Sequence, residues 1–199
     1  MTPVTAPVSD SDSATGRRRP ARIRLLEAMM SLDEHRSIQE YTVEELAAVA
    51  GVAKGSVYYQ FGSKEELVRE MLVYGAERLQ EIMEDGAADA GTSVSSARAA
   101  FAAQLSKALE FLDEYSSFTG LVAYALARRG ADESGQLRVE KQSIVALVAR
   151  GLQRLGHGDN AEITATALLA AAVTVSIERH TAHPEWTTAE CARVLMGMV

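Results

Sequence analysis

The sequence predicts an all-α protein. Alanine-rich runs with apolar residues at every third or fourth position recur along the 199 residues. Only four prolines interrupt them, and no run of alternating β-branched residues predicts a strand. A hydrophobic content of 47% is enough for a buried core. We expect about nine helices, in one large domain or in a small domain fused to a larger one.

The first 19 residues differ from the rest in composition. Residues 1–16 are rich in Ser, Thr, Pro and Asp, and such a segment cannot bury enough apolar surface to order itself. Arg17, Arg18 and Arg19 follow it directly. We therefore expect residues 1–19 to form a disordered basic arm ahead of the first helix.

Two helices are expected next. The first runs from about Pro20, a favourable first-turn residue, to about Arg36. The second begins at Thr42, because Thr42 and Glu45 have the spacing of a capping box. It should end before Gly51.

A very short third helix is predicted over residues 54–61. Gly62 follows it at the position of a left-handed C-terminal cap. Ser63 and Glu66 repeat the capping-box spacing and open a fourth helix. We place the first domain at 20–66 and a larger helical domain at 67–199.

The larger domain contains further amphipathic patterns. An alanine-rich helix is predicted at about 161–181, and Thr187 with Glu190 opens the last helix by a third capping-box spacing. The intervening patterns are Phe101, Leu105, Ala108 and Leu112; Phe118, Leu121, Val122 and Ala125; and Ile144, Val148, Gly151, Leu152 and Leu155.

Residues 42–61 have the spacing of a helix-turn-helix. Two helices that cross steeply need a small residue at the contact, a glycine in the turn and an apolar residue in the corner. Ala47, Gly51 and Val57 meet these three needs. The same spacing also occurs in chance helical hairpins, so the spacing alone does not establish a function.

The outward face of the third helix favours DNA binding. If Val57 and Phe61 point inward, the 100° helical step turns other side chains outward, and a major groove about 12 Å wide admits such a helix. Hydroxyls and an amide on this face suit phosphates and base edges. The outward residues are Gly55, Ser56, Tyr59 and Gln60, with Tyr58 at the flank.

Two further residues lie where helix N-termini favour phosphate. Thr42 starts the second helix and Lys64 starts the fourth. We expect both to lie near the DNA backbone.

The run TVEELAAVAGVAKGSVYYQFGSKEEL resembles the DNA-binding segment of the TetR (tetracycline-repressor) family of bacterial transcriptional regulators. The resemblance covers about 50 residues with the first helix. It implies a homodimer that binds a palindromic operator, usually as a repressor, and releases it when a small molecule occupies the C-terminal domain. It also implies DNA contacts by the matching residues Ser56, Tyr58, Tyr59 and Lys64, with Thr42 near phosphate.

Two positions of the motif carry their own expectations. Gln60 stands where the family often has histidine, and its amide can still donate to phosphate or read adenine. Lys54 lies where family members vary, which makes it a candidate specificity residue. The arginine arm either enters a minor groove or follows phosphates, or it is a solvated tail.

An effector cavity is predicted in the larger domain. Aromatic walls with a few polar groups suit a ligand pocket, and an amide on an apolar face must find a protein group or a ligand as partner. An aromatic stripe at helical spacing is more often part of an ordinary core than of a pocket, so we predict the cavity and not each lining residue. The candidate lining residues are Phe101, Gln104, Phe111, Tyr115, Phe118 and Tyr124.

A dimer interface is predicted on the last two helices. Small residues on one helix allow close approach, and an apolar stripe follows the other, so two helices from each subunit would form a four-helix interface about a two-fold axis. The candidate residues are Ala167, Ala170, Ala171, Thr174, Cys191, Val194, Leu195 and Met198.

Other functional classes fit the sequence less well. The single cysteine precludes an intrachain disulfide, and the one close histidine pair, His180 and His183, has no evident third ligand. No phosphate-binding glycine loop or nucleophile motif appears. A helical interaction module would explain the amphipathic stripes but not an exposed Tyr-Tyr-Gln face. We expect no enzyme, no cofactor and no metal, and a cytoplasmic protein without a signal peptide or membrane-spanning run.

Overall fold

A computed structural model describes residues 20–32, 36, 38–85, 93–127 and 135–199 of the chain. Across these residues the secondary structure is entirely helical, as the sequence predicts. The α-helices are α1 (Ala21–Met30), α2 (Val43–Val49), α3 (Lys54–Phe61), α4 (Lys64–Asp85), α5 (Val94–Glu114), α6 (Ser116–Ala127), α7 (Gly135–Arg154), α8 (Ala161–Thr181) and α9 (Thr188–Met196), with short 3₁₀ helices η1 (Ile38–Glu40) and η2 (Gly158–Asn160).

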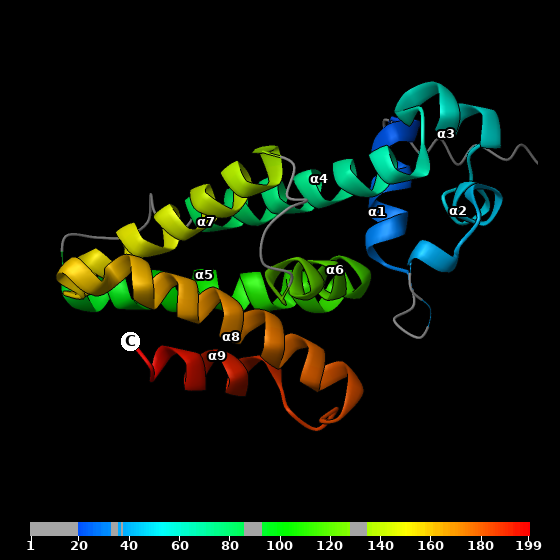
Figure 1. The fold of residues 1–199 in the computed structure, drawn as a ribbon. Helices are drawn as coiled ribbons and strands as arrows, with labels where there is room; N and C mark the ends of the chain where they lie inside the picture. The colour runs from blue at the N-terminus through cyan, green and yellow to red at the C-terminus, as the bar shows by residue number, and fades with distance from the viewer. Residues whose placement is uncertain (1–19, 33–35, 37, 86–92, 128–134) are drawn as a thin grey trace, which may run out of the picture.

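The helices form a small end and a larger bundle, joined by α4 (Figure 1). Helices α1, α2 and α3 pack together at one end, and α1 and α3 both contact α4. From there α4 runs along α7 and α5, while α8 packs against α7, α6 and α5 and α9 covers α5. The predicted boundary between residues 66 and 67 therefore falls inside one continuous helix.

Local signals locate several helices accurately. Helices α3 and α8 begin and end at the predicted residues. Both reciprocal hydrogen bonds of a capping box are present at Thr42 with Glu45, which opens α2, and at Thr187 with Glu190, which opens α9. The hydrophobic faces of these helices then join one core.

Two local predictions need correction. Helix α1 ends at Met30, not near Arg36, and Ser31 is its C-cap, with both its N–H and its hydroxyl directed to the Glu27 carbonyl oxygen at 3.2 Å. At the start of α4 only half a capping box forms. The Ser63 hydroxyl accepts from the Glu66 N–H at 3.1 Å, but the Glu66 carboxylate pairs with Arg69 instead.

Helix α8 bears on the expectation that the chain has no membrane-spanning run. With η2 it forms a segment, Gly158–Thr181, that is long and apolar enough to cross a membrane by length and composition alone, at a mean hydropathy of 1.4. Many alanines raise this average without any long run of bulky apolar residues. Only 33% of that segment's most apolar window is buried within the protomer, so α8 keeps an exposed face of small residues.

Candidate DNA-binding surface and effector cavity

Helix α3 is fixed to its domain by one face. Val57 and Phe61, one turn apart, are buried in the core, and α3 packs on α2 and α4. Tyr58 is half exposed and Tyr59 is 92% exposed. A tyrosine stabilises a fold mainly when its ring is buried, so the exposed ring of Tyr59 contributes little to folding.

The turn between α2 and α3 sets the direction of α3. Gly51 has a φ of +62°, and the next N–H, from Val52, donates to the Ala47 carbonyl oxygen at 2.9 Å. A Cβ at Gly51 would meet no atom within 4 Å, so the backbone conformation, not space, requires glycine here. The predicted small contact, Ala47, and corner residue, Val57, are both buried.

Lys54, at the start of α3, faces α2. Its ammonium group forms an ion pair with Glu44 and lies 5.9 Å from the centroid of the Tyr58 ring. The hydrogen bond from Lys54 holds the pKa of Glu44 below its usual range, and the same bond raises the pKa of Lys54. A DNA phosphate near Lys54 would compete with Glu44 for its ammonium group.

Thr42 is engaged in its own helix cap. Its hydroxyl accepts from the Glu45 N–H at 3.2 Å, and the Glu45 carboxylate accepts from the Thr42 N–H at 2.7 Å. The hydrogen bond from Arg36, followed by those from Thr42, lowers the pKa of Glu45 to about 2. Residues that start α2 are thus held rigidly, with Thr42 exposed at the surface.

The remaining predicted DNA contacts differ in exposure. Lys64 is half-buried, and its ammonium group donates to the Tyr41 carbonyl oxygen at 2.6 Å, which ties the start of α4 to the segment before α2. Gly55 is exposed, and Ser56 and Gln60 are half-buried. The Oε1 atom of Gln60 is buried and has no hydrogen-bond partner among the described residues.

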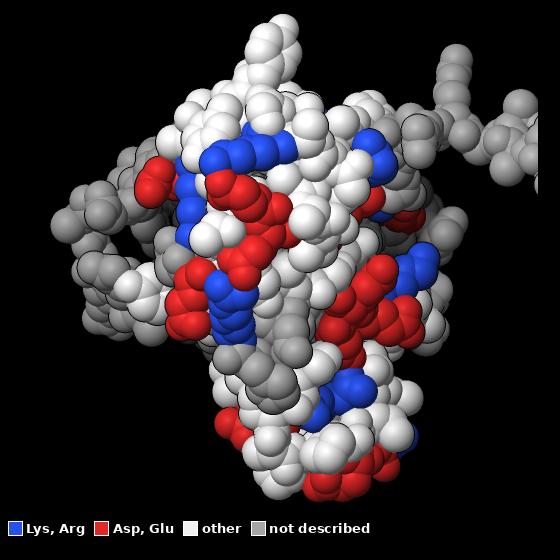
Figure 2. All heavy atoms as spheres, turned by 90° about the vertical axis from the view of Figure 1, so that its right-hand side faces the viewer, with Lys and Arg blue, Asp and Glu red and all other residues white. Residues whose placement is uncertain are grey.

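Charge at this end of the molecule is balanced. Among the coloured residues of Figure 2, Lys and Arg alternate with Asp and Glu across the face, with no broad basic patch. Ion pairs account for much of this balance; they join Arg22 to Glu70, Arg36 to Glu45, Lys54 to Glu44 and Arg69 to Glu66. Arg17, Arg18 and Arg19 lie outside the described residues.

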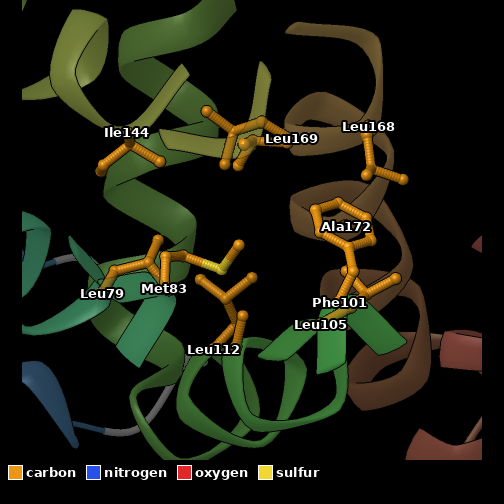
Figure 3. Close-up of a pocket in the computed structure, with 11 residues that line it drawn as sticks. Leu79, Met83, Phe101, Leu105, Leu112, Ile144, Leu168, Leu169 and Ala172 are labelled. Atoms are coloured by element: carbon orange, nitrogen blue, oxygen red, sulfur yellow. The ribbon is translucent and has the colours of Figure 1, made fainter. Parts of the chain in front are cut away.

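The larger bundle encloses a small apolar cavity between α4, α5, α7 and α8 (Figure 3), which we call the inner cavity. Its volume is about 30 Å³, and every side chain in its wall is apolar. Ligand pockets usually have 300–1,000 Å³, so the cavity is closed in this conformation. The lining residues are Leu79, Met83, Phe101, Leu105, Ala108, Leu112, Ile144, Val148, Leu168, Leu169 and Ala172.

Of the predicted pocket residues, only Phe101 lines the inner cavity. Gln104 is buried, and its amide donates to the Met83 carbonyl oxygen at 2.5 Å, so the partner of this amide is a protein group. Phe118 is buried in the core at an edge-to-face angle to Phe111. Tyr124 is 57% exposed.

Phe111 and Tyr115 instead line a separate cleft of about 300 Å³ between α1, α4 and α5. Their rings are 4.8 Å apart. Burial and the carboxylates of Glu114 and Glu27 raise the pKa of Tyr115. The sequence stripe on α5 therefore divides between two different hollows.

Known proteins match the chain most clearly over its N-terminal part. Residues 25–71 match the sequence profile of the bacterial regulatory proteins of the tetR family. We call residues 25–71 the TetR-family segment, because this stretch is similar to that family's profile. Curated relatives agree: the HTH-type transcriptional repressor KstR2 of Rhodococcus jostii is 38% identical over 72 residues, which are 36% of this chain and 32% of that protein. KstR2 of Mycobacterium tuberculosis is 38% identical over 61 residues, 31% of this chain and 30% of the relative.

Solved structures extend the likeness to the whole fold. A TetR-like transcriptional regulator from Rhodococcus has a TM-score of 0.65 at 19% identity, over 89% of this chain and 92% of that one. The regulator FadR from Bacillus subtilis, in complex with stearoyl-CoA, has a TM-score of 0.71 at 13% identity, over 88% of this chain and 96% of that one. At 19% and 13% identity these solved structures show the fold alone. The chain matches only about a third of the length of the curated relatives.

Outside the TetR-family segment, the predicted dimer residues fall into two groups. On α8, Ala167, Ala170 and Thr174 are exposed and Ala171 is half-buried. Val194 on α9 and Met198, two residues beyond its end, are 61% and 62% exposed. Cys191 and Leu195 are buried inside their own protomer, where α9 packs on α5.

Sequence reasoning missed the roles of Arg36, Leu79 and Met83. Arg36 joins Glu45 and lies 4.2 Å from the Tyr41 ring, so it supports the TetR-family segment from a connection that was expected to be helical. Leu79 and Met83 of α4 line the inner cavity. Their spacing of four on α4 was the available signal, since such pairs share a helix face.

Proposed function

We propose that this protein is a transcriptional regulator that binds a palindromic operator as a homodimer and is released by a small-molecule effector. It acts in the cytoplasm, as a repressor and not as an enzyme. The observation that carries the proposal is the exposed Tyr58 and Tyr59 face of α3, which Val57 and Phe61 hold rigidly from the opposite side. Such a face fits the major groove, and Gly55 permits close approach to the backbone of DNA.

Much of the positive charge for binding comes from outside α3. The described basic residues at this end are largely paired with acids, so the arm of Arg17, Arg18 and Arg19 supplies the phosphate contacts. Deletion of residues 1–19 should reduce the slope of log affinity against log salt by roughly one unit for each lost phosphate contact. An unchanged slope would show that the arm is a solvated tail.

The dimer forms through the exposed faces of α8 and α9. Ala167, Ala170 and Thr174 allow a partner helix to approach closely, and Val194 and Met198 contribute apolar area. A two-fold axis between the two copies places the α3 helices about 34 Å apart, one turn of DNA.

Helix α4 links the effector to DNA. Its first turns carry Leu67 and Met71, which are buried at its N-terminal end, and its last turns carry Leu79 and Met83 of the inner cavity. Because the inner cavity is closed, an effector must displace side chains on α4 in order to enter. We propose that this displacement moves α3 out of register with the operator.

The effector has a substantial apolar portion. The wholly apolar wall of the inner cavity supports this, because a buried polar ligand group there would find no partner. The stearoyl-CoA bound by a protein of the same fold is consistent with an effector of this kind.

In vitro selection of duplexes from a random DNA pool by the purified protein tests the proposal. We expect enrichment of an inverted repeat whose half-sites are about one helical turn apart. Enrichment of no sequence, or of a single half-site by a monomer, contradicts it. Once the operator is known, the coupling of effector and DNA can be measured. If the effector weakens operator binding by some factor, the operator should weaken effector binding by the same factor.

A further inference from the structure

A second hollow adjoins the inner cavity. It lies between α4, α5 and α7, has a volume of about 40 Å³, and shares the side chains of Met83 and Phe101 with the inner cavity. We call it the outer cavity. Its lining residues are Met83, Ala97, Ala100, Phe101, Gln104, Leu147, Arg150, Gly151 and Arg154.

The two cavities differ in chemistry. The inner wall has no polar side chain, whereas the outer wall carries Arg150 and Arg154, which lie one turn apart on α7 and are exposed. No Asp or Glu lines either cavity among the described residues. The described lining of the outer cavity therefore carries two cationic side chains and no acidic one, within a chain whose net charge is −7.

The polar groups of the outer cavity are not equivalent. The Gln104 amide already donates to the Met83 carbonyl oxygen, so it holds α5 to α4 and is not the anchor for a ligand. Guanidinium groups such as those of Arg150 and Arg154 suit a carboxylate or phosphate, because their donors match the geometry of these anions.

Phe101 separates the two cavities and rests on α7 where that helix has no side chain. A Cβ at Gly151 would lie 2.7 Å from Cδ2 of the Phe101 ring, so glycine is required for this contact. Any side chain at position 151 would push the ring away from α7. Met83, the other shared residue, is flexible and adapts to new shapes.

We propose that this site binds an amphiphilic anion whose apolar tail fills the inner cavity and whose anionic head meets Arg150 and Arg154. The tail passes Phe101, which swings from its place over Gly151, and Met83 moves with it. The inference rests on the proposed function only in naming the chemistry of its effector, since the binding itself requires no DNA.

The test compares three probes with the same tail. Decanoate, decanol and decyltrimethylammonium are titrated calorimetrically into the full chain without DNA, below their micellar concentrations. We expect decanoate to bind about tenfold more tightly than decanol, and the cationic probe to bind most weakly. Equal affinity for the three heads, or no binding of decanoate, overturns the proposal.

Variants then locate the head group. In Arg150→Gln with Arg154→Gln, both exposed substitutions, decanoate affinity should fall to about that of decanol while decanol affinity is unchanged. The control is Arg193→Gln, which removes an exposed arginine from α9 and should leave both affinities as they are. An unaltered preference for decanoate in the double variant contradicts the assignment of the head.

A glycine pair tests the tail. Gly151→Ala should displace Phe101 and change the affinities for decanoate and decanol by the same factor, whereas Gly120→Ala, whose new Cβ meets no atom within 4 Å, should change neither. Unchanged affinities in a folded Gly151→Ala protein would contradict the role given to Phe101. Thermal unfolding of both variants shows whether Gly151→Ala remains folded. If it does not, the head-group variants decide the question alone.

These results are separable from those on DNA. A protein that selects an operator but shows no preference for decanoate retains the proposed function and refutes the amphiphilic anion. A protein that binds decanoate through Arg150 and Arg154 but selects no DNA retains the site and refutes the regulator.

Discussion

Tyr59 and Tyr124 are both exposed tyrosines, but they lie on different helices: Tyr59 on α3, whose opposite face is buried in the core, and Tyr124 on α6. Val57 and Phe61 bury that face, and Tyr59 extends away from it with 92% of its surface exposed. Tyr124 lies on α6 in the larger bundle, far along the chain from the TetR-family segment. These two residues therefore form a matched pair for mutation.

Tyr59→Ala should weaken operator binding about tenfold or more, because a contact to base edges or the backbone contributes roughly 1–3 kcal/mol. The melting temperature should stay close to that of the wild type, since the ring has almost no contacts within the protein. Fluorescence anisotropy with labelled operator measures the first quantity. Tyr124→Ala serves as the control and should bind normally; equal losses in the two variants would point to a general effect of surface tyrosines.

The stabilisation provided by Glu45 should depend on pH. Hydrogen bonds from Arg36 and Thr42 lower its pKa from 4.5 to about 2. Because the pKa of Glu45 is lower in the folded than in the unfolded protein, its ionised carboxylate stabilises the folded state at pH values above the unfolded pKa. This stabilisation is lost as the pH falls from about 5 towards 2.

We expect Glu45→Gln to lower the melting temperature at pH 7 by about 2–4 °C, the shift for one helix cap in a chain of this size. The difference from wild type should shrink as the pH is lowered towards 3. Thermal unfolding monitored by circular dichroism checks this, with Glu77→Gln on an exposed face of α4 as the comparison. A difference that is constant with pH would be incompatible with the assigned cause.

At the scale of the helix, local sequence signals worked where no distant residue competed. The sequence predicts both ends of α3, because Gly62 caps the helix and the buried pair Val57 and Phe61 marks its inward face. Helix α1 ends at Met30, before the predicted end near Arg36, and hydrophobic periodicity carries no signal for this end.

The turn between α2 and α3 yields a paired prediction. Gly51→Ala forces a side chain into a positive φ and should destabilise the protein by about 1–2 kcal/mol in urea unfolding. Gly55→Ala lies within a helix with open space around its new Cβ, so stability should be kept or slightly raised.

DNA affinity should show the reverse order for the two folded variants. Gly55→Ala should bind operator more weakly, because the added methyl group stands between α3 and the groove. Gly51→Ala should retain the wild-type affinity at a temperature where it is folded. Gly55→Ala with normal operator binding would mean that α3 does not approach DNA closely.

For the whole molecule, the sequence predicted the fold class and the TetR-family segment but not which residues share a cavity. Phe101 lies on α5 and Tyr115 directly follows that helix, yet 14 residues separate them by about 21 Å. Helical periodicity identifies the inward face and not the position along it. The inner cavity also needs Leu79 and Leu168 from α4 and α8, and their proximity arises only from tertiary packing.

The proposed dimer is testable by charge. Ala170→Glu places a carboxylate on the exposed face of α8, so sedimentation velocity should show mainly monomer at micromolar concentration, and operator affinity should fall at least tenfold. Ala103→Glu adds the same charge to an exposed position of α5 and should remain dimeric. Full dimerisation of the Ala170→Glu protein would place the interface elsewhere.

Helix α4 has 22 residues in one uninterrupted run, a rod of about 33 Å. A rod of that length converts a small rotation into a large translation, so a tilt of about 5° at one end moves the other by about 3 Å. If the α4 helices of two subunits tilted in opposite senses, the spacing of their α3 helices would change by up to twice that distance. This is a large fraction of the width of a major groove, which is about 12 Å.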